Sequence, residues 1–263
     1  MSILFEKKAG VARVTLNRPE VRNAFDEAAI AAVTDCFLSL AKDKGIRATV
    51  IRGKGPDFCA GADIGWMRRA ADYKPAESKK DSGRLVGMYR AIDACPVPVI
   101  VGVHGGCFGG GLGIVASSDI AVAASGARLA FSECRLGIVP AIISSFVLPK
   151  IGSGQARRYY LTAEAFGAEA ALRMGLVHEV APESELDARI EMIVQSILKA
   201  GPLAVREAKA MIRKASAMPF EKRVRYTVET LARIRATAEA KEGLSAFLEK
   251  RPPAWAQAAD ERP

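Results

Sequence analysis

Apolar residues follow two different spacings along the first two thirds of the chain. Four short apolar runs have the length and composition of strands: residues 11–16, 48–52, 97–103 and 120–124. Between the first two runs, apolar residues recur every three to five positions, as one face of a helix requires: Phe25, Ile30, Val33, Phe37 and Leu40. Strands that alternate with helices predict an α/β layered domain.

The last third of the chain has a helical pattern only. Residues 186–200, 203–216 and 220–250 predict helices, and Pro202 and Pro219 suit the first turns of the second and third. No low-complexity linker separates this part from the rest. We therefore expect a core domain at residues 1–185, followed by a helical region at residues 186–263.

A glycine-rich segment, residues 104–113, follows directly after the third predicted strand. It reads His-Gly-Gly-Cys-Phe-Gly-Gly-Gly-Leu-Gly and holds six glycines in ten residues. Glycine has no Cβ, so backbone N–H groups in this segment can approach a ligand closely. A helix-like stretch begins at residue 112, and the positive end of its dipole adds to the unpaired N–H groups. The segment is suited to hold negative charge.

The familiar phosphate-binding motifs do not fit this segment. The chain has no G-x-x-x-x-G-K-[ST] sequence, and the segment lacks an ordered G-x-G-x-x-G with an acidic residue about 20 positions later. A turn that packs a helix tightly on a strand is the other interpretation of the glycines. Three further segments favour a binding site over that turn.

Those segments lie on both sides of the glycine-rich one. Residues 55–64 (Gly-Pro-Asp-Phe-Cys-Ala-Gly-Ala-Asp-Ile) follow a strand, residues 131–140 place Glu133 in a largely apolar stretch, and residues 17–24 read Asn-Arg-Pro-Glu-Val-Arg-Asn-Ala. Together the four segments resemble the crotonase superfamily, the enoyl-CoA hydratases and isomerases. The resemblance extends from about residue 3 to about residue 250.

The resemblance implies a fold, an assembly and a substrate. The fold is an α/β crotonase-type spiral of ββα units, and the C-terminal helical region packs subunits into homotrimers that commonly pair as hexamers. The substrate is an acyl-coenzyme A thioester, with no permanently bound cofactor. Two backbone N–H groups stabilise the enolate oxygen of the thioester in this family, and in this sequence they belong to Ala62 and Gly110.

Contacts with coenzyme A follow from the same resemblance, at Val21, Arg22, Ala60, Asp63 and Ile64. The Arg22 guanidinium would meet a phosphate or stack on adenine. Phe247 and Lys250 would reach the cofactor pocket of a neighbouring subunit, with helix packing and solvent exposure as an equal alternative. Glu20 stands where relatives often carry lysine, which puts one phosphate contact in doubt.

The carboxylates depart from those of the best-known hydratases, which use two glutamates to hold water and pass its proton to the α-carbon. Aligning the glycines puts the first of these positions at Gly113. Glu133 is the glutamate that remains, and we expect it to act as the general base. Asp119 resembles the buried structural acid of the family rather than a replacement for the missing glutamate.

We therefore expect hydration of a 2-enoyl-CoA. The Phe-Gly-Gly-Gly-x-Gly loop and the downstream Ser-Glu resemble hydratases of 3-methylglutaconyl-CoA and related branched glutaconyl-CoA thioesters. Gly113 would then border the acyl group, and His104, Arg68 and Arg69 are candidate cations for a substrate carboxylate. An enoyl-CoA isomerase or decarboxylase of the same fold is an alternative, and so is a non-catalytic member that binds RNA or protein.

Composition adds expectations about compartment and partners. The 263 residues include five cysteines, an odd number without paired spacing, and two histidines, too few for a His-rich metal site. We expect a cytoplasmic protein without metal, secretion signal or membrane span, because no leader-like start and no run of 18 apolar residues is visible. The net charge of +9 suits coenzyme A, nucleic acid or an anionic surface alike. No RNA-recognition signature is present, so nucleic acid is not an expected partner.

Overall fold

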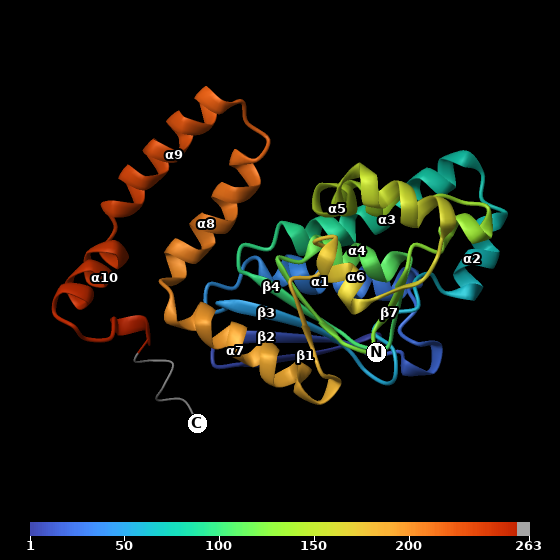
Figure 1. Cartoon of the computed structure of the whole chain (residues 1–263), viewed down its shortest axis with the longest axis horizontal. Coiled ribbons are helices and arrows are strands. Elements are labelled where there is room, and N and C mark those ends of the chain that lie inside the picture. The colour runs from blue at the N-terminus through green and yellow to red at the C-terminus, as the bar shows by residue number, and fades with distance from the viewer. Residues whose placement is uncertain (257–263) are drawn as a thin grey trace.

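The computed structural model describes residues 1–256 of the chain, and the end of the predicted helical region, residues 257–263, lies outside the described residues. A six-stranded sheet forms the centre of the molecule (Figure 1). In spatial order its strands are β1 (Ile3–Lys8), β2 (Val11–Leu16), β3 (Ala48–Gly53), β4 (Val99–Val103), β6 (Ile120–Ala124) and β9 (Glu179–Ala181). β1 pairs antiparallel with β2, and the other neighbours are parallel.

The four predicted strands lie next to one another in this sheet as β2, β3, β4 and β6. The third begins at Val99 rather than at residue 97, because Pro98 has no N–H to donate to a ladder. A second sheet joins β5 (Gly106–Phe108), β7 (Arg128–Ala130) and β8 (Phe166–Gly167). β5 carries the chain from the end of β4 into the glycine run.

Alternate residues of the large sheet face two separate apolar cores. On one face, Val14 and Val101 pack under a layer of helices, which Figure 1 shows above the sheet. These helices are α1 (Glu27–Leu40), α3 (Pro75–Asp93), α4 (Gly110–Ser117), α5 (Ala141–Thr162) and α6 (Ala168–Arg173). The short helix α2 (Ile64–Ala71) lies at the outer end of this layer. The predicted α/β layering is confirmed.

Helix α7 (Leu186–Lys199) covers the opposite face. Its residues Ile190 and Val194 pack with Val50 and Ile100 of the sheet in the second core. The sequence places a boundary at residue 186, but α7 presents a buried stripe to the strands and is part of the core. The helices that stand apart from the sheet begin later, at Pro202.

Three helices form an arm that projects from the core (Figure 1): α8 (Pro202–Ala215), α9 (Phe220–Arg235) and α10 (Ala238–Leu248). Two cations of α8 tie the arm to the core. Arg206 donates to the carbonyl of Ile46 (2.7 Å), and Lys209 contacts Asp119 (2.5 Å). Asp119 also accepts from the Val99 amide (2.7 Å), so this acid has the structural role that the sequence predicts.

The predicted helix 220–250 is two helices. α9 ends at Arg235, and the side chain of Thr237 accepts from the Ala240 amide as the N-cap of α10. Pro202 is in the first turn of α8 as predicted, whereas Pro219 is the residue before α9. None of the helices within residues 1–256 combines the length and apolar character needed to cross a bilayer.

Candidate active site

A cavity of about 260 Å³ lies where α2, the N-terminus of α4 and the segment before α5 meet. Its lining is largely apolar, with Glu133 as the one ionisable side chain among the described residues that border it. The lining residues are Phe25, Ala60, Gly61, Ala62, Trp66, Met67, Ala70, Leu85, Gly109, Gly110, Ser132, Glu133, Leu136, Ile138, Val139, Pro140, Ala141, Ile142 and Ile143. The structure therefore brings Ala62, Gly110 and Glu133, the three predicted catalytic residues, to one cavity.

Two glycines let the backbones of the two loops approach each other at this cavity. Gly61 has φ +90° and Gly109 has φ +47°, a region that other residues rarely adopt. A methyl group on Gly61 would lie 2.9 Å from the Phe108 carbonyl oxygen and 3.6 Å from the Gly110 nitrogen. Glycine at position 61 is therefore what allows the amides of Ala62 and Gly110 to converge.

Both converging amides are available to a ligand. Within residues 1–256, neither the Ala62 nor the Gly110 N–H donates a hydrogen bond in the structure. Gly110 is the first residue of α4, so the positive end of that helix dipole adds to its N–H. Two unpaired donors beside an apolar cavity suit an oxygen that gains negative charge during a reaction.

Glu133 begins a short 3₁₀ helix, Glu133–Leu136, and faces the glycine run. A methyl group on Gly109 would lie 3.4 Å from its Oε1. Its Oε2 is buried and has no hydrogen-bond partner among the described residues. Burial raises the pKa of Glu133 above its ordinary value, because an apolar surrounding disfavours the charged form. A carboxyl group in this state is suited to take up and release protons.

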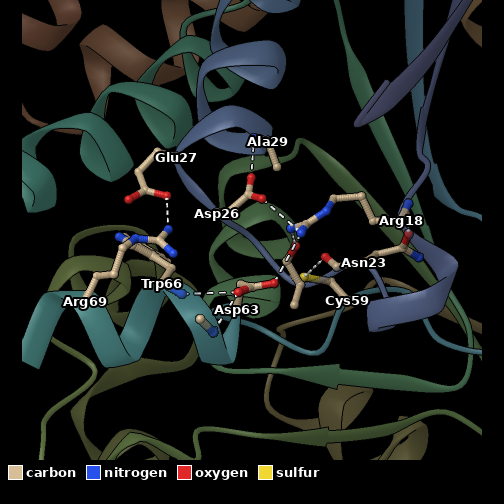
Figure 2. A network of polar contacts seen from close by, with 11 residues as sticks. Arg18, Asn23, Asp26, Glu27, Ala29, Cys59, Asp63, Trp66 and Arg69 are labelled. Carbon is tan, nitrogen blue, oxygen red and sulfur yellow. Dashed lines mark hydrogen bonds and ion pairs between the residues drawn. The ribbon is translucent and has the colours of Figure 1, made fainter.

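An ion-pair clamp holds the loop that carries Ala62 (Figure 2). The Arg18 guanidinium lies 2.9 Å from Asp26 and 3.2 Å from Asp63. The Phe25 N–H also donates to the Gly61 carbonyl oxygen at 2.7 Å. This hydrogen bond ties the segment before α1 to the loop that carries Ala62. The Ala62 amide thus sits between anchored neighbours.

Asn23 is a second anchor of this loop, and the sequence did not single it out for this role. Its side chain donates to the carbonyls of Lys54 and Asp57, both at 2.9 Å, and accepts from the Arg18 amide. The Cys59 thiol donates to its carbonyl at 3.2 Å, as Figure 2 shows. A buried amide with every polar atom paired stiffens the turns on which the site is built.

Of the residues predicted to contact coenzyme A, Ala60 borders the cavity, and Val21, Arg22, Asp63 and Ile64 lie in or at the end of the two loops beside it. Ala60 lines the cavity, and its amide donates to the Arg22 carbonyl at 2.9 Å. The side chains of Arg22 and Ile64 are largely exposed. The Asp63 carboxylate is instead occupied, because it accepts from the Gly65 and Trp66 amides as the N-cap of α2. Its side chain therefore has a structural role at the start of α2.

Val21 is half-buried in the same loop, within the short helix Pro19–Val21. Phe247 and Lys250 lie elsewhere, at the end of α10. In Figure 1, α10 and α2 are at opposite ends of the molecule. Phe247 is 80% exposed. These two residues therefore do not border the cavity of their own chain.

Four residues expected near the acyl group do not line the cavity. Gly113 is buried in α4, and a methyl group there would lie 2.4 Å from the Tyr89 ring. His104 is buried at the end of β4, where its Nε2 is 2.9 Å from the Gly55 carbonyl oxygen. Arg68 is exposed on α2, and Arg69 pairs with Glu27 at 2.7 Å. The Gly113 expectation rests on the family resemblance and the other three on the need for a cation, whereas the packing of helices and loops decides which side chains reach the cavity.

Several lining residues carried no strong signal in the sequence. Trp66, Met67 and Ala70 come from one side of α2, and Leu85 comes from α3. An apolar stripe on α2 and α3 was the available signal, but such a stripe does not distinguish a pocket from ordinary packing. Within residues 1–256, no three His, Cys, Asp or Glu side chains are grouped closely enough to hold a metal ion.

Comparison with known proteins identifies the family. The family model "Enoyl-CoA hydratase/isomerase" matches residues 6–258. The crotonyl-CoA hydratase of Syntrophomonas wolfei is 32% identical over 253 residues, which are 95% of this chain and 96% of that protein. An enoyl-CoA hydratase structure from Shewanella pealeana has a TM-score of 0.93 at 34% identity, covering 97% of this chain and 96% of its own.

A further solved structure, Pseudomonas aeruginosa AtuE, has a TM-score of 0.94 at 34% identity and covers 98% of this chain and 100% of its own. The predicted crotonase-type fold is confirmed by this agreement over nearly the whole length of the chain. The chain is an enzyme of the enoyl-CoA hydratase/isomerase family, the crotonase superfamily.

Proposed function

We propose that this enzyme hydrates the double bond of 2-enoyl-CoA thioesters. The observation that carries the proposal is the cavity in which Glu133, whose buried Oε2 has no hydrogen-bond partner among the described residues, faces two free backbone amides. Family membership supports the same reaction, since the similar proteins include a crotonyl-CoA hydratase. Val21, Arg22, Ala60 and Ile64 are the proposed contacts for coenzyme A at the mouth of the cavity.

One carboxylate is enough for the proposed chemistry. Glu133 takes a proton from water while the water oxygen forms a bond to Cβ, and the electrons of the double bond move toward the thioester oxygen. The Ala62 and Gly110 amides stabilise that enolate oxygen. Protonated Glu133 then gives its proton to Cα, so that one water molecule is added and the carboxylate is restored.

The lining also bears on the acyl chain. A substrate carboxylate would need a cation, because an unpaired charge in an apolar cavity is costly. None of the described residues that line the cavity is a cation. We therefore propose an uncharged acyl chain, straight or methyl-branched, over a 3-methylglutaconyl-type substrate. A cation from a neighbouring subunit would be required for the latter.

A screen of thioesters tests this proposal. Crotonyl-CoA, 2-methylcrotonyl-CoA and 3-methylglutaconyl-CoA are incubated with the enzyme, and loss of enoyl absorbance is followed with mass detection. We expect the mass of the two uncharged substrates to increase by one water. Glu133→Gln should still bind acetoacetyl-CoA, seen as a raised thermal midpoint, and turn over at least about 100-fold more slowly.

Other outcomes would overturn parts of the proposal. An unchanged mass with a moved double bond would make the enzyme an isomerase, and loss of carbon dioxide would make it a decarboxylase. Faster turnover of 3-methylglutaconyl-CoA would overturn the uncharged acyl chain. A protein without turnover or thioester binding, but with salt-dependent RNA binding, would be a non-catalytic member.

We also propose that the arm assembles subunits into a homotrimer, alone or paired as a hexamer. Val224, Val228 and Leu231 are exposed at 42, 63 and 52% and recur along one side of α9. Such a stripe on a projecting helix is typical of an interface between chains. The exposed Phe247 of α10 and the nearby Lys250 would then be able to reach a neighbour's coenzyme A.

A further inference from the structure

Tyr89 is a buried residue that contacts the glycine run from behind the cavity. It lies on α3 with no exposed surface, and its hydroxyl donates to the Gly110 carbonyl oxygen at 2.7 Å. Gly110 is the residue whose N–H faces the cavity. Tyr89 does not border the cavity itself, so it has no direct contact to offer a substrate.

The ring of Tyr89 has little room to move. On one side it lies against Gly113, where an added methyl group would be 2.4 Å from Cζ and 2.7 Å from the hydroxyl oxygen. On another side it meets the Phe146 ring edge-on, with centroids 5.6 Å apart. The hydroxyl is therefore held in place by packing. Burial raises the pKa of Tyr89 well above its ordinary value, so the hydroxyl remains a donor at physiological pH.

The first turn of α4 needs such a tether. Three consecutive glycines, residues 109–111, start the helix, and glycine loses more conformational freedom on ordering than any other residue. The Leu112 amide bonds to the Gly109 carbonyl at 3.0 Å, which shows that this turn is tight. The hydrogen bond from Tyr89 to the Gly110 carbonyl fixes the peptide plane between Gly110 and Gly111. This plane is joined at the Gly110 Cα to the plane that carries the Gly110 N–H, so fixing it limits the directions that this N–H can take.

We propose that Tyr89 is a positioning residue for the oxyanion site: its hydroxyl holds Gly110 so that the Gly110 N–H points at the thioester oxygen. This inference rests on the proposed function. It also gives Gly113 a role, because glycine at this position makes space for the Tyr89 ring. The position that carries a glutamate in two-carboxylate hydratases is here part of the support for the backbone donor.

Tyr89→Phe tests the proposal, because it removes the hydroxyl and keeps the ring. The matched control is Tyr159→Phe, a buried tyrosine of α5 that packs on Phe166 (4.6 Å between centroids) and does not border the cavity. For each protein, kcat and KM are measured with crotonyl-CoA. The red shift in the absorbance of bound 2,4-hexadienoyl-CoA is also recorded, since it reports how strongly the amides polarise the thioester carbonyl.

We expect Tyr89→Phe to lower kcat about tenfold, which corresponds to about 1.4 kcal/mol, the size of one hydrogen bond. KM should stay within about twofold, and the red shift should decrease. Tyr159→Phe should have the same kcat, KM and red shift as the wild type. Tyr89→Phe with a wild-type kcat and red shift would overturn the inference, and so would a decrease shared equally by Tyr159→Phe. Absence of turnover and red shift in the wild type would instead overturn the proposed function.

Discussion

At the scale of single residues, the burial of Glu133 links catalysis to stability. Its pKa is raised in the folded protein, so the folded state binds a proton more tightly than the unfolded chain does. Stability therefore falls as pH rises from the ordinary glutamate pKa of 4.5 through the folded-state value. Above that range, the folded state bears the cost of a partly buried charge.

Glu133→Gln should consequently be more stable than the wild type at pH 7 to 8 and about equally stable near pH 3, where the carboxyl group is protonated in both states. Thermal midpoints across pH check this expectation, with the exposed Glu20→Gln as control. A gain that is the same at every pH would argue against titration of Glu133 as its cause.

The activity should depend on the same titration. As pH is lowered, kcat/KM should begin to fall above pH 4.5, because Glu133 must be ionised to accept a proton.

Gly113 and Gly87 offer a second comparison, with the same substitution in two neighbouring helices. Gly113→Ala should cost about 1–3 kcal/mol of unfolding free energy, because its methyl group meets the immobile Tyr89 ring. Gly87→Ala should gain about 0.5–1 kcal/mol, since a methyl group there has no heavy atom of the described residues within 4 Å. Chemical denaturation measures both, and equal effects would show that the Tyr89 contact is not restrictive.

These residues also mark the limit of prediction from sequence. The resemblance to the crotonase superfamily, which four segments carry jointly, implied that Ala62, Gly110 and Glu133 belong to one site, and in the structure they border one cavity. The contact between Gly113 and Tyr89 joins residues 24 positions apart along the chain, and it depends on how α3 packs on α4. No periodic pattern reports such a contact. The expectation that Gly113 borders the substrate came instead from the resemblance, because two-carboxylate hydratases carry a glutamate at this position.

At the scale of elements, α2 is the helix that connects stability to the cavity. Asp63 caps its N-terminus and pairs with Arg18, while Trp66 and Met67 on the same helix line the cavity. The cap therefore holds the Ala62 loop and the cavity lining at once. Residues 27–40, 110–117 and 202–215 are helices whose existence the sequence predicts, whereas α2 and α3 were not singled out. Those stretches contain many alanine, glycine and charged residues, so their large apolar side chains form only a weak stripe and do not predict a helix clearly.

Asp63→Ala should cost about 1 kcal/mol of stability through the lost cap and lower kcat/KM about tenfold through a loosened Ala62 loop. Thr237→Ala removes the same kind of cap from α10, far from the cavity. It should cost similar stability and leave kcat/KM close to the wild type. Denaturation midpoints and steady-state kinetics on both variants check this difference. Similar kinetics for the two variants would show that the α2 cap does not affect the active site.

At the scale of the whole molecule, the arm leaves apolar surface that its own core does not cover. Val228→Glu places a charge in the middle of the exposed stripe of α9 and should shift the assembly toward monomers in sedimentation. Lys222→Gln changes the net charge by the same amount on an exposed position of the same helix and should leave the assembly intact. A monomeric wild-type protein, or an unaffected Val228→Glu variant, would contradict the proposed assembly.

The position of the carboxylate in the cavity bears on the stereochemistry of the product. Among the described lining residues, Glu133 carries the one carboxyl group, and in the proposed function the two amides hold the thioester in one orientation. The hydroxyl and the new hydrogen must then arrive on the same face of the double bond. Hydration of a trans-2-enoyl-CoA in D₂O should yield a single diastereomer with syn deuterium, identified by the coupling constant between the Cα and Cβ protons. The anti diastereomer would require a second proton donor on the opposite face.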